Sequence, residues 1–284
     1  IGGYQRGYKW SKKEILELLN DIANYNENDG LYCLQPLILK PLSNDVQKIN
    51  FGESYSSIFT KNEVVDGQQR STTLYFLLKY LYFKEDISSD YLFEIDFQTR
   101  ERSGVFLKEH LHSIFEFNAE NITEKELSDK DYNDLKTVNL LWKSFIEKYK
   151  EFNNVDVYHF FVVSTYLKRW IEIYLSDDLH RKKFIEKVLE NVKVIWYSLD
   201  HSQKDDEIIN VFLNNNKGKI GLTSSELIKA LFILDIINNE PESISNLKIN
   251  QFALEWDSIE KQLQDDRFWY FIKFNENEYT YRTS

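Results

Sequence analysis

Methionine is absent from the 284 residues of this chain, and cysteine occurs once, at Cys33. A single cysteine excludes an intrachain disulfide framework, so a reducing compartment is the default and we expect a cytoplasmic protein. Average composition would supply several methionines. Because the chain also begins at Ile1, we expect the sequence to omit residues, either at its ends or internally.

Long hydrophobic runs are also missing. No stretch reaches about eighteen apolar residues, so we expect no membrane-spanning helix and no membrane partner. The opening residues, IGGYQR, lack the basic and then apolar pattern of a secretory signal peptide. The net charge of -11 argues against a general clamp for duplex DNA, which normally carries a basic surface.

Proline and glycine are scarce, with three and nine residues respectively, so long helices should dominate. A capping-box pattern at 11–14 precedes the first amphipathic helix. Apolar residues at helical spacing predict further helices at 71–83, 101–115, 130–150, 157–175, 179–191, 205–213, 224–237 and 250–263.

Strand signals are fewer and shorter. Residues 34–39 contain Pro36 and therefore predict an edge strand; residues 43–61 predict a polar loop or hairpin that leads into a strand at 64–65. Alternating apolar residues predict strands at 92–97 and 192–199. We therefore expect an α+β protein with a small α/β core in residues 1–100. A larger, mostly α-helical domain follows in 101–284, with a returning strand near 192–199 and a loop near 212–223.

The segment 64–74, VVDGQQRSTTL, carries the strongest functional signal. It predicts a strand, a tight turn at Gly67 and a helix N-terminus, which together present backbone N–H groups and the positive end of a helix dipole to an anion. Arg70 can contact phosphate or carboxylate through two N–H groups at once. A capped helix after a hairpin explains Asp66, Gly67 and one hydroxyl, but it gives no reason for Gln-Gln-Arg.

The side chains of this segment suit a nucleotide-phosphate site. Gly67 permits a positive φ and close approach of the backbone to a ligand. Asp66 could orient Arg70, hold a water of Mg²⁺ or cap the helix. The remaining candidates are Gln68 and Gln69, which could position a water or read a base edge, and Ser71, Thr72 and Thr73, which add hydroxyl and amide donors. The pattern is not a Walker A loop.

Two other segments are weaker candidates. Tyr4, Gln5 and Arg6 lie among aromatic residues that could form a stacking and phosphate-contact surface, although an N-terminal strand with its aromatic residues in the core explains them better. The polar loop 214–223 contains Asn216 and Lys219. It is either a plain connection between helices or a lid over a nucleotide.

Other chemistries lack their residues. The five histidines are dispersed and form no Cys/His cluster, so we expect no protein-held metal site of the zinc type. No G-x-S-x-G elbow indicates a serine hydrolase.

The three candidate segments occur together and in order, and in this the chain resembles the N-terminal domain family of GmrSD-type modification-dependent restriction enzymes, whose core is ParB/sulfiredoxin-like. The D-G-Q-Q-R-x-T-T-L signature is complete at 66–74. The signature F-x-x-x-N-x-G-K-I-x-L-T-x-x-E-L-I-K-A matches 212–230. The opening pattern I-P-x-Y-Q-R-x-Y-x-W is present except that Gly2 replaces the usual proline; its matching residues are Ile1, Tyr4, Gln5, Arg6, Tyr8 and Trp10.

The resemblance implies a module that binds and hydrolyses a nucleoside triphosphate, with Mg²⁺, in defence against phage or modified DNA. It makes D-G-Q-Q-R the hydrolysis motif. The residues it implicates in hydrolysis are Asp66, Gln68, Gln69 and Arg70, and those it implicates in nucleotide binding are Tyr4, Gln5, Arg6, Gly67, Ser71, Thr72, Thr73, Asn216 and Lys219.

Family members commonly carry an HNH-type nuclease domain after the helical body. The chain shows no such motif, so we expect it to act on DNA only indirectly, through a nuclease domain or subunit on another segment or polypeptide. The resemblance leaves a homodimer open. It also leaves open two other activities for the same pocket: nucleotide sensing or DNA recognition without turnover, and phosphoryl transfer to an acceptor other than water.

Overall fold

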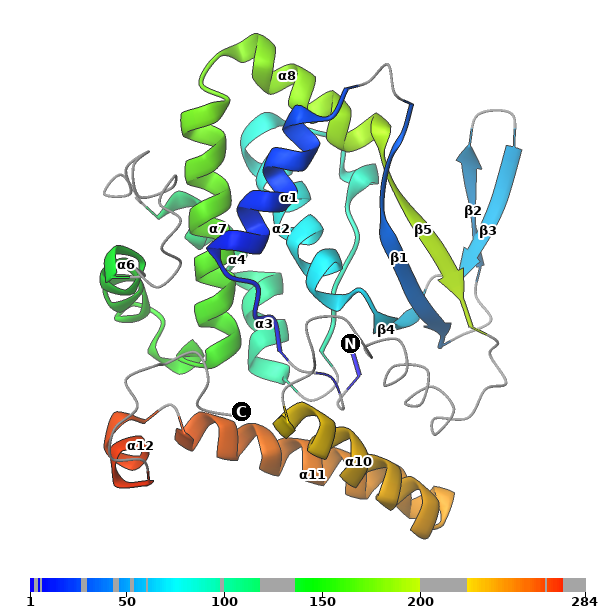
Figure 1. Cartoon of the computed structure of the whole chain (residues 1–284), viewed down its shortest axis with the longest axis vertical. Helices are drawn as coiled ribbons and strands as arrows, with labels where there is room; N and C mark the ends of the chain where they lie inside the picture. The colour runs from blue at the N-terminus through cyan, green and yellow to red at the C-terminus, as the bar shows by residue number, and fades with distance from the viewer. Residues whose placement is uncertain are drawn as a thin grey trace.

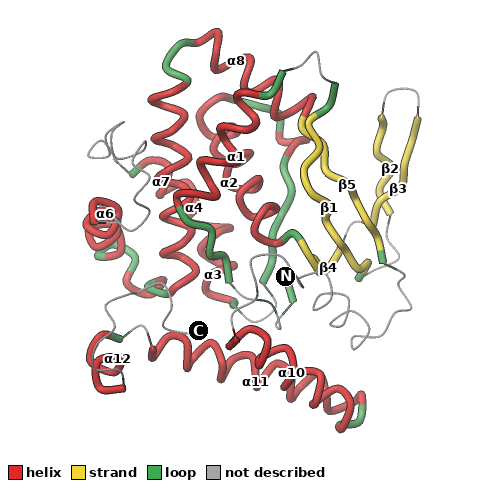
Figure 2. Tube along the Cα trace, in the orientation of Figure 1, coloured by secondary structure: helices red, strands yellow, loops and turns green. Residues whose placement is uncertain are grey.

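Helices predominate in the computed structural model of the chain, and the strands form a small sheet at one side (Figure 1). The same division is plain when the trace is coloured by secondary structure in Figure 2. The predicted α+β class, a small sheet with a larger helical body, is confirmed. The structure describes residues 1–2, 5, 7–26, 30–42, 46–51, 54–59, 61–97, 100–117, 136–199, 224–263 and 265–272.

The first helix begins as its capping box predicts. The backbone N–H and the hydroxyl of Ser11 both donate to Oε2 of Glu14, at 2.8 and 2.6 Å. The helices are α1 (Lys12–Asn24), α2 (Gln68–Glu85), α3 (Glu101–Glu109), α4 (Leu111–Glu116), α6 (Lys136–Ile146), α7 (Val155–Tyr174), α8 (Asp178–Glu186), α10 (Ser224–Asn239), α11 (Glu242–Leu263) and α12 (Asp266–Ile272). The described residues also include short 3₁₀ turns at Ser89–Tyr91 and Lys150–Phe152 and a π-helical turn at Lys187–Asn191.

The predicted helices at 101–115 and 250–263 differ most from those observed. The single helix expected at 101–115 is α3 and α4, because the backbone of His110 leaves the helical region while its ring packs on Phe106, Tyr149 and Phe152. Helix α11 begins before the predicted residue 250, because the carbonyl of Pro241 accepts the first N–H groups of an earlier turn. Residues 130–135 and the helix predicted at 205–213 lie outside the described residues.

The described strands are β1 (Tyr32–Pro41), β2 (Val46–Phe51), β3 (Ser54–Phe59), β4 (Asn62–Asp66) and β5 (Val192–Ser198). Strands β2 and β3 form the expected hairpin, and β4, β1 and β5 form a sheet in that order. The prediction that the Pro36 segment is an edge strand is wrong, since β1 is central, antiparallel to β4 and parallel to β5. The register against β5 shifts between Leu34 and Leu37, and this irregularity accommodates a residue with no N–H.

Residues 92–97 form no strand in the described structure, so that prediction is wrong too. Their alternation reflects burial rather than strand pairing, because Ile95 and Phe97 enter the hydrophobic core from an extended segment.

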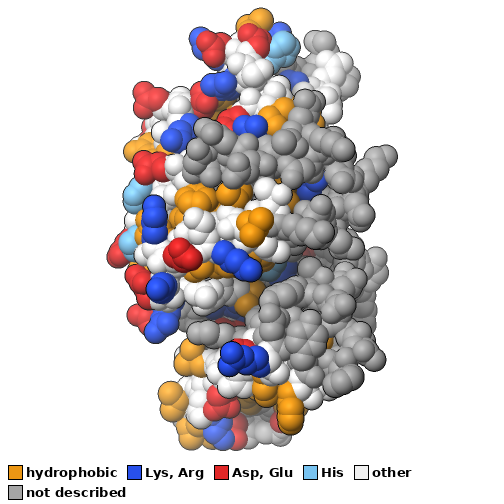
Figure 3. Space-filling view, turned by 90° about the vertical axis from the view of Figure 1, so that its left-hand side faces the viewer, with side chains coloured by type: hydrophobic (Ala, Val, Ile, Leu, Met, Phe, Trp, Pro, Cys, Tyr) orange, Lys and Arg blue, Asp and Glu red, His pale blue; other side chains and the backbone are white. Residues whose placement is uncertain are grey.

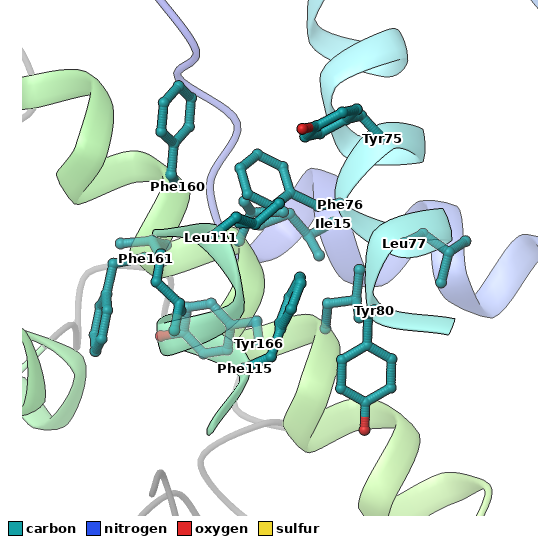
Figure 4. Close-up of a cluster of buried hydrophobic side chains, with 14 of the residues drawn as sticks. Ile15, Tyr75, Phe76, Leu77, Tyr80, Leu111, Phe115, Phe160, Phe161 and Tyr166 are labelled. Carbon is teal, nitrogen blue, oxygen red and sulfur yellow. The ribbon is translucent and has the colours of Figure 1, made fainter. Parts of the chain in front are cut away.

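Aromatic side chains of α2 and α7 fill the centre of the core (Figure 4). The rings of Phe76 and Phe160 lie 5.3 Å apart between centroids, and Tyr80 meets Phe115 of α4 edge to face at 5.4 Å. This one buried cluster includes residues from Tyr8 to Val188, on both sides of residue 100. The expected division into domains at that residue stays a prediction.

Helices α10 and α11 lie across one end of the helical body (Figure 1) and are tied to it by a buried ion network. Nη1 of Arg100 donates to both carboxylate oxygens of Asp156, at 2.7 and 2.8 Å, and Nη2 donates to Asp257 of α11 at 3.1 Å. Nζ of Lys229 in α10 lies 3.6 Å from Asp257. Burial opposes the charge of Arg100, but the surrounding carboxylates outweigh it and raise its pKa.

The surface shows no segregation of charge on the face in Figure 3, where basic and acidic side chains are interspersed. None of the helices in the described part of the chain is long and apolar enough to cross a membrane.

Replacing Arg100 by Met should lower the free energy of unfolding by about 3–5 kcal/mol, because Asp156 would be left as a buried carboxylate without its cation and Asp257 would keep only Lys229. Urea unfolding measures this change. Arg102→Met is the matched control, since Arg102 is exposed. It should stay within about 0.5 kcal/mol of wild type. Equal stabilities of the two variants would mean that the ion pairs of Arg100 do not stabilise the fold.

Candidate functional site

The predicted strand, turn and helix N-terminus are present at 62–85. Strand β4 ends at Asp66, Gly67 has φ 98°, and α2 begins at Gln68. The helix thus starts earlier than the predicted residue 71, and Gln68, Gln69 and Arg70 form its first turn. The N–H of Ser71 donates to the carbonyl of Gly67 at 2.9 Å, which closes that turn. The first N–H groups of such a turn have no carbonyl one turn earlier in the helix.

Gly67 is required by both conformation and space. A positive φ of this size is the left-handed region that side chains with a Cβ rarely adopt. A Cβ built on Gly67 would lie 2.2 Å from Cδ2 of Leu37 and 3.3 Å from Nη2 of Arg70. The turn therefore lets β1 approach the start of α2 closely.

Arg70 reaches from the first turn of α2 to the irregular part of β1. Its Nη1 donates to Oε1 of Gln35 at 2.7 Å, and its Nη2 donates to the carbonyl of Pro36 at 2.8 Å. Its Nε is buried and has no hydrogen-bond partner among the described residues. Burial lowers the pKa of Arg70 and the charge of Asp66 opposes this shift. A guanidinium nevertheless stays charged at neutral pH.

Gln69 bonds the N-terminal segment through both ends of its amide. Its Oε1 accepts the N–H of Lys9 at 2.7 Å, and its Nε2 donates to the carbonyl of Gly7 at 3.0 Å. The amide thus satisfies one backbone N–H and one backbone carbonyl, as a neighbouring strand would do. This arrangement holds residues 7–9 against the start of α2.

Two more contacts join the same segments. The amide of Gln5 donates to the carbonyls of Val64 and Val65 in β4, the latter at 3.0 Å. The hydroxyls of Tyr8 and Thr73 are 2.8 Å apart, and burial of Tyr8 raises its pKa far above the ordinary value. The structure therefore brings the N-terminal candidate segment against the D-G-Q-Q-R turn.

The hydroxyl residues of α2 are buried, and two of them have partners inside the protein. Oγ of Ser71 donates to the carbonyl of Gly67 at 3.1 Å and Oγ1 of Thr73 to that of Gln69 at 3.0 Å. Oγ1 of Thr72 has no hydrogen-bond partner among the described residues, and Gln68 is also buried. Their expected contacts with nucleotide stay predictions. Tyr4, Arg6, Asn216 and Lys219 lie outside the described residues.

A cavity of about 440 Å³ opens beside Asp66 and Arg70. Strand pairing explains its lining, because Ile38 of β1 is the register partner of both Asp66 in β4 and Tyr197 in β5. The described residues that line it are Gln35, Pro36, Ile38, Asp66, Arg70, Ile195 and Tyr197. Sequence reasoning missed the β1 and β5 members, whose signals were the proline inside a strand and the alternation of β5.

The carboxylates near the cavity decide how Mg²⁺ could be held there. No group of three or more His, Cys, Asp or Glu side chains that could hold a metal occurs in the part of the chain that the structure describes. Asp66 is the single carboxylate among the described cavity residues. Mg²⁺ in nucleotide sites is typically held by one or two carboxylates together with phosphates and waters. Asp66 therefore fits an ion that enters with a triphosphate.

Gly67→Ala should lower the free energy of unfolding by about 1–2 kcal/mol for the left-handed φ, plus about 1–3 kcal/mol for the overlap with Leu37. Chemical denaturation measures the sum. Gly30→Ala is the control, since Gly30 has φ 94° but a Cβ there meets nothing within 4 Å. If both variants lose the same unfolding free energy, the close approach of Leu37 to Gly67 is refuted.

Gln69→Glu should release the N-terminal segment, because a carboxylate still accepts from Lys9 but cannot donate to the carbonyl of Gly7. We expect a loss of about 1–3 kcal/mol in unfolding free energy and faster hydrogen exchange at residues 7–9. Glu17→Gln, an exposed change on α1, should alter neither. Unchanged exchange in Gln69→Glu would mean that the amide does not hold the segment.

Comparison with known proteins agrees with the family resemblance. A family model described as "GmrSD restriction endonuclease, N-terminal domain" matches residues 1–233, which include the whole three-stranded sheet, the D-G-Q-Q-R turn and the first part of α10. No curated protein and no solved structure matches the chain. The chain belongs to the family of GmrSD restriction endonuclease N-terminal domains.

Proposed function

We propose that the chain is the nucleoside-triphosphate-binding and hydrolysing module of a restriction system that acts in phage defence. One observation carries the proposal: Arg70 is held on the wall of a cavity, at the first turn of α2 and beside Asp66. Family membership adds the restriction system. The ParB/sulfiredoxin-like character of the small sheet and its motif helix is part of the same proposal.

Phosphate binding follows from the charges around Arg70. Two of its N–H groups bond β1, and because Arg70 lines the cavity, the second N–H groups of Nη1 and Nη2 can donate to phosphoryl oxygens. Since β1 already fixes the guanidinium, little side-chain freedom is lost when a ligand binds. The N-terminal end of α2 adds a positive partial charge in the same place.

Hydrolysis requires positioning and charge stabilisation more than covalent chemistry. Arg70, with Arg6, neutralises the charge that develops on the transferred phosphoryl group, and Asp66 orients Arg70 and would hold a water of Mg²⁺. Gln68 orients the attacking water, while Gln69 acts by holding residues 7–9. Mg²⁺ bound to the triphosphate would neutralise the remaining phosphate charge. Asn216 and Lys219 complete the pocket.

DNA cleavage belongs to an HNH-type nuclease domain or subunit that the module regulates. Binding or hydrolysis of the nucleotide shifts the helical body and so changes the activity of that partner. The module itself works in the cytoplasm, as a monomer or a homodimer.

The alternative function is a nucleotide sensor or DNA-recognition module without turnover. Both ends of the Gln69 amide are engaged and cannot orient water, so hydrolysis would depend on Gln68 alone, and the sensor needs no such residue. Wild-type protein that binds a nucleoside triphosphate in equilibrium dialysis but releases no phosphate would establish the sensor. A phosphorylated product in place of free phosphate would indicate phosphoryl transfer.

Arg70→Ala should reduce steady-state phosphate release from the preferred triphosphate by about 100-fold or more, because it removes the charge aimed at the phosphoryl group. Arg70→Lys keeps the charge but not the two hydrogen bonds to β1, so its rate of phosphate release should lie between those of wild type and Arg70→Ala. Lys84→Ala is the matched control, since it removes one exposed positive charge from the other end of α2.

Thermal unfolding of each variant separates loss of function from loss of fold. If correctly folded Arg70→Ala releases phosphate at the wild-type rate, the assignment of Arg70 is wrong. If Lys84→Ala lowers the rate of phosphate release as much as Arg70→Ala does, the effect comes from the overall charge and not from the site.

A further inference from the structure

The cavity beside Arg70 has an apolar half that phosphate chemistry does not use. Strand β5 alternates across the sheet: Val192 and Val194 pack against the core, whereas Ile195 and Tyr197 are 52% and 58% exposed. The two exposed side chains line the cavity together with Ile38 of β1. A phenol ring and two branched aliphatic side chains thus face the same space as Arg70 and Asp66.

Strand register places the charged half of the cavity, at Asp66, and its apolar half, at Tyr197, on the two outer strands of the sheet. Asp66, Ile38 and Tyr197 are successive partners across β4, β1 and β5. Neighbouring strands lie about 4.8 Å apart, so the backbones of Asp66 and Tyr197 are separated by roughly 10 Å. A ligand whose charged end lies at Asp66 and Arg70 has room to place its other end against Tyr197.

The charges of the cavity give the ligand a direction. Arg70 is the one cation among the described lining residues, so the phosphate end belongs at β4 and α2. A guanidinium only donates hydrogen bonds, so the Gln35 atom bonded to Arg70 is the amide oxygen. The other end of that amide, Nε2, is a hydrogen-bond donor on a side chain that lines the cavity.

We propose that Tyr197, with Ile195 and Ile38, binds the base of the nucleoside triphosphate by stacking, and that Nε2 of Gln35 donates to an acceptor on the edge of that base. This inference rests on the proposed function and names the base-recognition half of the same site. A planar aromatic group with hydrogen-bond acceptors at its rim matches an aromatic wall with an amide donor. The cavity volume of about 440 Å³ lies within the range of roughly 300–1,000 Å³ found for small-molecule sites.

The experiment compares nucleotides with inorganic tripolyphosphate, which has the charge but no base. The full chain is titrated calorimetrically with ATP, GTP, CTP, UTP and tripolyphosphate in the presence of Mg²⁺. Tyr197→Ala should raise the Kd of the preferred nucleotide about 10-fold or more and leave the Kd of tripolyphosphate unchanged. Tyr197→Phe keeps the ring and should bind like wild type.

Trp196→Ala is the matched control for Tyr197→Ala. Trp196 is the preceding residue of β5, is 41% exposed, and by strand alternation lies on the opposite face of the sheet. It should leave every Kd unchanged. Circular dichroism of each variant confirms the fold, which an exposed position such as Tyr197 should not disturb.

The outcomes separate this inference from the proposed function. If Arg70→Ala abolishes nucleotide binding while Tyr197→Ala binds all four nucleotides like wild type, the nucleotide site stands and the base assignment is overturned. If Tyr197→Ala weakens tripolyphosphate as much as the nucleotides, the effect is not one of base stacking and the assignment is again overturned. If wild type binds neither nucleotides nor tripolyphosphate, the proposed function itself fails.

Discussion

The hydrogen bond from Arg70 to the carbonyl of Pro36 ties the motif helix to the central strand, and the candidate site is built around it. The accepting carbonyl lies in the part of β1 where the register against β5 shifts. The hydrogen bond also requires the start of α2 to lie close to β1, which only a glycine at 67 allows. A helix terminus, a strand irregularity and a left-handed turn thus combine to fix one guanidinium.

The first turn of α2 is also where the N-terminal segment attaches. Gln69 bonds the backbone on either side of Tyr8, and Tyr8 in turn meets Thr73 one turn along the helix. Gln5 adds bonds to β4. Residues of the signature therefore divide between two tasks: Asp66 and Arg70 face the cavity, whereas Gln69 and Thr73 organise the protein behind it.

Local signals in the sequence were sufficient for the strand, the turn and the helix that carry the motif. They misplaced the start of α2, because the run of hydroxyl residues resembles an N-cap while the actual cap is Gly67 with its positive φ. Pro36 indicated an edge strand because a proline cannot donate in a ladder, yet an irregular register removed that requirement. The cavity residues on β5 could not be predicted, since their meeting with Arg70 depends on a parallel pairing between strands more than a hundred residues apart.

The buried ion network around Arg100 connects α10 and α11 to the N-terminal segment that contacts the start of α2. A Cβ on Gly7 would lie 2.0 Å from Oδ1 of Asp156 and 2.6 Å from Nη1 of Arg100, so the N-terminal segment lies directly on that ion pair. The other side of the same segment is bonded to Gln69 at the first turn of α2. Because Arg100 also bonds Asp257 of α11, a movement of α10 and α11 that breaks this bond acts on residues in contact with Gly7. Closely packed interiors transmit such displacements instead of absorbing them. The geometry therefore links α10 and α11 to the start of α2 through one short segment of backbone.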